Sequence, residues 1–182
     1  MKKNILIISL LITGNLCFSQ LFENPKNFTT VQLSYALGGQ SSREDIRTSP
    51  PIDEDFWKTR VYSVQAFQHR YLIGRYFAVG LGGVFTYQTD PNLGYAQILL
   101  DMRGFLSDEE NTVYPFIRGG TAISTNLDYN KSIILGLGIG YRFHLFDKLW
   151  SVDLSRDARQ FWLKDDVGTF TGTLSLSLGI QL

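Results

Sequence analysis

The sequence predicts an all-β protein: a closed, up-and-down antiparallel β-barrel of eight strands that crosses a membrane, after a cleaved N-terminal signal peptide. The first observation is the stretch SIILGLGIGYRFHL at residues 132–145. Every second residue from Ile133 to Leu145 is apolar and those between are small, polar or charged, except Ile134, so the period is that of a strand. The second observation is its length, because a tilted membrane-spanning strand needs about 9–11 residues and ordinary strands average about 5–6. The third is that the same alternation recurs along the chain.

Residues 1–20 predict a secretory signal peptide. Lys2 and Lys3 supply a basic start, and the apolar run at 5–12 is too short to span a bilayer as a helix. A lipoprotein anchor at Cys17 is disfavoured, because Leu16 precedes it where a small residue is expected. Since the chain has 1 Cys, removing this segment leaves no thiol for a disulfide.

The remaining residues, 21–182, form one predicted barrel domain. Eight segments in it have strand periodicity and are separated by turn-forming or charged residues. They are residues 29–40, 59–71, 76–88, 93–106, 113–125, 132–145, 149–160 and 169–182.

The first four strands differ in what alternates with their apolar rows. The first two begin such rows near Val31 and Tyr62 and alternate them with Ser and Gln. The third, YFAVGLGGVFTY, alternates large apolar residues with small ones. The fourth carries Ala96 on its apolar row and Asp101 and Arg103 on its polar row.

The last four strands follow the same rule with one irregularity. In the fifth, Pro115 and the pair 119–120, both Gly, predict a β-bulge. The sixth is the stretch at 132–145. The seventh alternates Trp150 and Val152 with polar residues, and its far end is not defined by the alternation. The eighth, TGTLSLSLGIQL, alternates Leu with Ser and Thr.

Short connections favour neighbouring antiparallel strands, and closing the sheet removes both edges. The longest connection, 41–58, carries Pro50 and Pro51 and cannot be the interior of a strand. Eight strands enclose a space just wide enough for side chains.

The signal segment and the strands YFAVGLGGVFTY, ILGLGIGYRF and TGTLSLSLGIQL resemble the small outer-membrane β-barrel proteins of Gram-negative bacteria, the group that includes the OmpA and OmpX membrane domains. The resemblance implies an integral outer-membrane protein with both termini in the periplasm and with residues 41–58 outside the cell. The chain ends on Leu182, whereas such proteins usually end on an aromatic residue.

Aromatic residues near the strand ends predict two interfacial girdles, although aromatic residues also favour strands in general. The periplasmic girdle would comprise Tyr76, Phe77, Phe105, Tyr114, Phe143, Phe146 and Trp150. The outer girdle would comprise Phe85, Tyr87, Tyr129, Phe161, Trp162 and Phe170.

Charged residues on the inward rows predict a structural Asp–Arg network that blocks the periplasmic half of the lumen. Buried charges require partners, because removal of one partner costs about 3–5 kcal/mol. An ion path is the alternative. The residues concerned are Asp101, Arg103, Arg118, Arg142 and Asp153.

The expected role is therefore structural, or accessory to a larger envelope complex. The expected partners are outer-membrane lipid and another envelope protein that binds the loop 41–58, where Phe56 and Trp57 resemble interface anchors. The alternative for this loop is an exposed segment with no partner. Alternative functions are a lipid-modifying enzyme and a narrow channel for small solutes.

Catalytic chemistry is disfavoured. The only histidines are His69 and His144, both expected near the periplasmic end, whereas a lipid A-modifying site should open toward the exterior. No metal-ligand cluster or phosphate-binding loop is present, so no catalytic residue, cofactor or metal is expected. Loss of Lys2 and Lys3 from 17 basic residues leaves 15 against 17 acidic ones, which disfavours a nucleic-acid partner.

Overall fold

The computed structural model of the chain describes residues 27–42, 59–89, 92–125, 129–163 and 168–182. The expected signal peptide at 1–20 lies outside these residues, as do Phe56 and Trp57.

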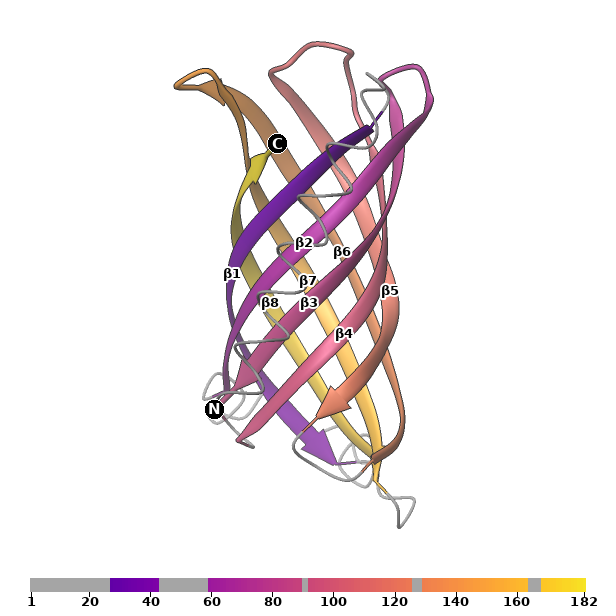
Figure 1. Cartoon of the computed structure of the whole chain (residues 1–182). Coiled ribbons are helices and arrows are strands. Elements are labelled where there is room, and N and C mark those ends of the chain that lie inside the picture. The colour runs from indigo at the N-terminus through magenta and orange to yellow at the C-terminus, as the bar shows by residue number, and fades with distance from the viewer. Residues whose placement is uncertain (1–26, 43–58, 90–91, 126–128, 164–167) are drawn as a thin grey trace, which may run out of the picture.

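Eight strands form a closed antiparallel barrel in chain order (Figure 1). Each strand pairs with the next along the chain, and β8 closes the barrel against β1. The predicted all-β, eight-stranded barrel is confirmed. The strands are β1 Asn27–Ser42, β2 Thr59–Ile73, β3 Phe77–Gln88, β4 Leu93–Gly104, β5 Thr112–Thr125, β6 Tyr129–Leu145, β7 Lys148–Leu163 and β8 Gly168–Gln181.

The barrel has two distinct ends. At one, which we call the turn end, β2–β3, β4–β5 and β6–β7 are joined by turns, and the backbone amides of Thr29 and Leu182 each donate to the other's carbonyl oxygen, at 3.1 and 2.8 Å. We call the opposite end the loop end; there β1 ends at Ser42 and β2 begins at Thr59. The first described residues and the C-terminus therefore lie at the same end (Figure 1).

The β6–β7 turn is the tightest of the three. Its two central residues, Phe146 and Asp147, have φ values of 51° and 56°. Positive φ at both positions matches the twist of a two-residue hairpin, for which Asn and Gly are the usual residues.

The bulge expected around Pro115 lies elsewhere. The β4–β5 register shifts between Ala96 and Gln97, so that Ile123 is the extra residue on β5. Pro115 lies one position beyond the last β4–β5 pair, Arg103 with Phe116, so its missing N–H does not interrupt that ladder. The strand β7 also extends farther than residue 160, to Leu163.

The barrel is apolar outside and largely polar inside. On β6, Leu135 and Leu137 point outward and are 54% and 65% exposed, whereas Ser132 and Arg142 on the other row are buried. Outward-facing Leu, Ile and Val side chains are exposed on all the other strands as well. Such a surface needs an apolar medium around it. Within the described part of the chain, no helix is long and apolar enough to cross a bilayer.

Three aromatic residues expected in the girdles point into the lumen instead. Phe105, Tyr114 and Phe161 are each 4% exposed or less. Tyr114 lies on the same row as Arg118, and the row of Phe161 includes Asp153, so alternation along the strand places both rings inside. Tyr76 and Tyr87 are exposed, at 50% and 42%, which suits an interfacial position.

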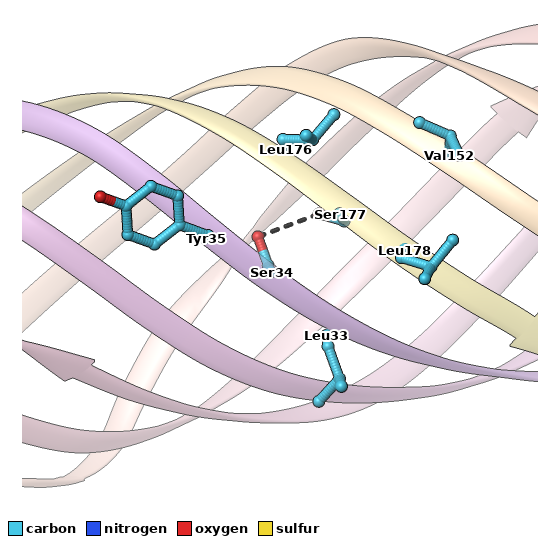
Figure 2. Close-up of a pocket in the computed structure, with 7 residues that line it drawn as sticks. All are labelled: Leu33, Ser34, Tyr35, Val152, Leu176, Ser177 and Leu178. Atoms are coloured by element: carbon cyan, nitrogen blue, oxygen red, sulfur yellow. Dashed lines mark hydrogen bonds between the residues drawn. The ribbon is translucent and has the colours of Figure 1, made fainter.

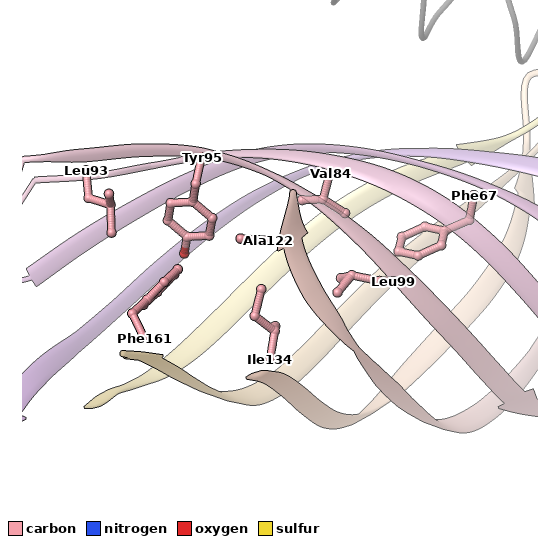
Figure 3. Close-up of a cluster of buried hydrophobic side chains, with 8 residues drawn as sticks. All are labelled: Phe67, Val84, Leu93, Tyr95, Leu99, Ala122, Ile134 and Phe161. Atoms are coloured by element: carbon pink, nitrogen blue, oxygen red, sulfur yellow. The ribbon is translucent and has the colours of Figure 1, made fainter. Parts of the chain in front are cut away.

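Two clusters of buried apolar side chains occupy the lumen. The turn-end cluster comprises Phe28, Tyr71, Ala78, Phe105, Tyr114 and Phe116. The loop-side cluster comprises Phe67, Val84, Leu93, Tyr95, Leu99, Ala122, Ile134 and Phe161 (Figure 3). In the loop-side cluster the rings of Tyr95 and Phe161 meet edge to face, with centroids 5.1 Å apart (Figure 3). Polar side chains lie between and beside these clusters.

The outward surface makes a graded prediction for β6. Ile139→Arg should make folding into lipid vesicles less favourable by about 2–4 kcal/mol, because position 139 faces outward near the middle of the strand, opposite Leu154 of β7. Leu145→Arg, on the same face at the end of β6, should cost about 0–1 kcal/mol. Urea titration of folding into vesicles measures both. Equal costs at the two positions would contradict a lipid-facing surface.

Candidate functional site

The candidate site is a charged network across the lumen, built from inward-facing residues of five strands. The carboxylates are Asp101 of β4 and Asp153 of β7, and each is 0% exposed. Both lie on rows that alternate with outward apolar residues, so strand periodicity alone points them inward.

Asp101 accepts three hydrogen bonds. Its Oδ1 accepts from Arg103 Nε at 2.8 Å and lies 3.0 Å from His69 Nε2, and its Oδ2 accepts from Arg118 Nε at 2.5 Å. Arg103 is two residues along the same strand, and Arg118 is the register partner of Asp101 on β5. Hydrogen bonds to a buried carboxylate offset the cost of removing its charge from water.

Asp153 accepts hydrogen bonds from two other strands, β1 and β5. Its Oδ2 accepts from Arg118 Nη2 and from Gln32 Nε2, each at 2.8 Å. Its Oδ1 accepts a short hydrogen bond from the hydroxyl of Tyr114. Two guanidinium groups therefore meet two carboxylates, which balances the charge of the network without His69.

Arg118 is the group that joins the two carboxylates. Its remaining contacts are Nη1 to Gln65 Oε1 and Nη2 to Gln32 Oε1, both at 3.1 Å. Its guanidinium carbon lies 5.2 Å from the Phe67 ring centroid and 4.3 Å from that of Phe116, one ring from each apolar cluster. Cation–π contacts of this kind strengthen when the cation is desolvated.

Glycines on β6 leave the space that this network occupies. β6 lies between β5 and β7, and its inward row runs through Gly136, Gly138 and Gly140. A Cβ atom at Gly138 would lie 2.6 Å from the Phe116 ring, and one at Gly140 would lie 2.5 Å from Asp153 Oδ1. Because no side chain rises from this row, Arg118 reaches across β6 to Asp153.

Arg142, the fifth charged residue expected in the network, contacts neither carboxylate. Its Nη1 donates to the Tyr71 hydroxyl at 2.7 Å, and Nε and Nη2 donate to the carbonyl oxygens of Glu110 and Glu109 at 3.0 and 2.8 Å. Its guanidinium also lies 4.6 Å from the Phe105 ring centroid. Arg142 pairs in register with Thr112 at the start of β5, so it lies nearer the turn end than Asp101 and Asp153 do.

A second charge pair, with Arg159 buried and Asp157 partly exposed, lies on the loop side and was not expected. Arg159 Nη2 is 3.4 Å from Asp157 Oδ2, and Arg159 Nη1 donates to Thr173 Oγ1 at 2.7 Å. The hydroxyl of Ser175 also donates to Asp157. Both charged residues continue the inward row of β7, so extending the alternation beyond Asp153 would have found them.

The two histidines lie in different surroundings. His69 is wholly buried, its ring is stacked on Phe28 with centroids 4.7 Å apart, and Thr30 Oγ1 lies 3.5 Å from its Nδ1. His144 lies exposed near the turn end. Among the described residues, no group of three or more His, Cys, Asp or Glu side chains is placed to hold a metal ion.

Of the comparisons with known proteins, the one with solved structures supports this fold. No family model matches the chain, and no curated protein matches it. The solved structure of Neisserial surface protein A (NspA) is similar with a TM-score of 0.58 and 11% identity, covering 85% of this chain and 96% of that one. Ail of Yersinia pestis, solved with the heparin analogue sucrose octasulfate, gives a TM-score of 0.39 and 11% identity, covering 86% and 99%.

At 11% identity, the likeness to NspA concerns the fold. It confirms the expected resemblance to eight-stranded outer-membrane barrels at that level. The fold and the site together define an eight-stranded barrel of the outer-membrane type whose lumen contains a paired Asp–Arg network.

The glycine row makes a testable prediction. Gly140→Ala should lower the free energy of unfolding by about 1–3 kcal/mol, because the new Cβ would overlap Tyr114 and Asp153. Gly94→Ala is the matched control, since a Cβ there has no heavy atom within 4 Å. Urea unfolding of both variants in detergent micelles measures the difference. Equal stability of the two variants would show that the inward row of β6 can accommodate a Cβ atom without steric overlap.

Proposed function

We propose that the chain is an integral outer-membrane protein whose barrel is closed to solutes by its own side chains. The observation that carries this proposal is the Asp101–Arg118–Asp153 bridge, which crosses the lumen between β4 and β7. The apolar outward face and the likeness in fold to NspA support the membrane location. In this proposal the turn end, with the C-terminus, faces the periplasm.

The proposed role is structural, or accessory to a larger envelope complex. A lumen occupied by paired charges and aromatic rings supports this role over transport, because eight strands leave space only for side chains. Function would then depend on the ends of the barrel. Residues 41–58 form the longest connection, and Phe56 and Trp57 are the proposed anchors for an envelope partner.

The closed lumen is tested by conductance in planar lipid bilayers. The wild-type barrel should give no unitary current steps. Arg118→Ala should give short cation-selective steps, because it removes the bridge, leaves Asp153 without an ion-pair partner and leaves Asp101 with Arg103 as its remaining guanidinium partner. Arg60→Ala, at an exposed position near the loop end of β2, should stay silent. Steady conductance by the wild-type barrel would overturn the proposal.

The partner role is tested with Phe56→Ala/Trp57→Ala in the full chain. If these residues are interface anchors, quantitative mass spectrometry of native pull-downs should show at least tenfold less of one companion, since losing an anchor typically costs more than about 1.4 kcal/mol. Glu54→Gln/Asp55→Asn, in the same loop, should leave recovery within twofold. Equal recovery with the aromatic variant would exclude these anchors.

A further inference from the structure

Arg156 is a charged residue on the outward surface near the middle of the barrel, where its neighbours are apolar. Arg156 is exposed and lies just past the middle of β7, a strand of 16 residues, on its loop-end side. Its register partners are Leu137 of β6 and Leu174 of β8, which are 65% and 49% exposed on the same outer surface. Its guanidinium has no hydrogen bond or ion pair with any residue that the structure describes.

The row of β7 around Arg156 gives the guanidinium a direction. Toward the turn end the outward residues are Leu154 and Val152, whereas toward the loop end they are Ala158 and Gln160. A long cationic side chain in an apolar setting extends toward the nearer polar region. The guanidinium of Arg156 is therefore expected to extend toward the loop end.

A groove lies on the same surface, next to Arg156. It has a volume of about 410 Å³ and crosses the seam where β8 closes against β1 (Figure 2). This volume falls in the range of about 300–1,000 Å³ typical of ligand pockets. The groove is lined by Leu33, Ser34, Tyr35, Val152, Leu176, Ser177 and Leu178.

The groove has apolar side chains along its sides and strand backbone as its floor. The pairs Leu33–Leu178 and Tyr35–Leu176 face each other across the seam. Between them the floor is the backbone at Ser34 and Ser177, whose side chains lie on the inward rows and hydrogen-bond to each other at 2.9 Å (Figure 2). Both hydroxyls therefore face the lumen and are turned away from a ligand in the groove.

Register places Arg156 at one end of this groove. Arg156 pairs with Leu174, and the next outward pair toward the turn end is Leu154 with Leu176, a groove residue. Diagonal neighbours of this kind lie about 7–8 Å apart, within reach of an arginine side chain. The guanidinium thus lies on the loop-end side of the groove, and the apolar walls run from it toward the turn end.

We propose that Arg156 and this groove form a binding site for a phosphate-bearing lipid of the surrounding leaflet. The inference rests on the proposed membrane location. Arg156 binds the lipid phosphate, and one acyl chain lies in the groove between Leu176 and Tyr35. A cation that has no protein partner on an apolar surface is stabilised by an anion from outside the protein. In a membrane, the lipid phosphate is such an anion.

The test uses native mass spectrometry of the full chain in a nonionic detergent. The probes are dimyristoyl phosphatidylglycerol and dimyristoyl glycerol, which share acyl chains and differ in the phosphate. The wild-type barrel should bind the phosphate-bearing lipid at least tenfold more tightly. Excess inorganic phosphate should not displace it, because the acyl chain contributes to binding. Equal affinity for the two lipids, or displacement by inorganic phosphate, would overturn the inference.

Three variants identify the parts of the site. Arg156→Gln should lose at least fivefold in affinity for phosphatidylglycerol and none for dimyristoyl glycerol. Arg70→Gln, an exposed outward arginine near the turn end, is the matched control and should bind as wild type. Val152→Phe should weaken binding of both lipids, because the larger ring occupies the groove. Wild-type binding by Arg156→Gln or by Val152→Phe, or an equal loss in Arg70→Gln, would overturn the inference.

The same samples separate this inference from the proposed function. Heat-modifiable migration on gels reports whether each variant is a folded barrel. A wild-type chain that neither folds in detergent nor enters vesicles would overturn the proposed membrane location. Folded, inserted barrels without lipid selectivity would overturn only the site at Arg156.

Discussion

The structure depends on one guanidinium that joins two buried carboxylates. Arg118 bonds to Asp101 at 2.5 Å and to Asp153 at 2.8 Å, and so connects β4, β5 and β7 through the lumen. A buried ion pair of this kind is costly to desolvate, and additional hydrogen bonds are needed to offset that cost. Gln32, Gln65, Tyr114 and the other arginine supply the remaining hydrogen bonds.

This constraint explains features that otherwise look unrelated. The glycines of β6 are needed because side chains there would occupy the path from Arg118 to Asp153. The rings of Phe67 and Phe116 flank the guanidinium on both sides, and Tyr114, which was expected in a girdle, donates to Asp153 from inside the barrel. The outer surface must be apolar, since lipid provides no hydrogen bonds. Arg156 is the exception near the middle of β7, where its outward neighbours are apolar.

Four of the five charged residues expected to form the network do come together, and alternation along the strand is the reason. Asp101, Arg103, Arg118 and Asp153 each lie on an inward row, which the sequence displays directly. Arg142 also lies on an inward row, but its height in the barrel places it with Tyr71. The position of a residue in the alternation tells whether its side chain points inward or outward. It does not tell which residues of other strands lie at the same height in the barrel.

The sequence by itself determined the strand period, the number of strands, and which residues face in or out. These properties are local, because side chains in a strand alternate between its two faces whatever the strand's neighbours are. Only the tertiary structure decided the contacts across the lumen, the burial of His69 against Asp101 and the groove on the β1–β8 seam. Those depend on register and closure, which bring residues from opposite ends of the chain to the same level, as Ser34 and Ser177 show.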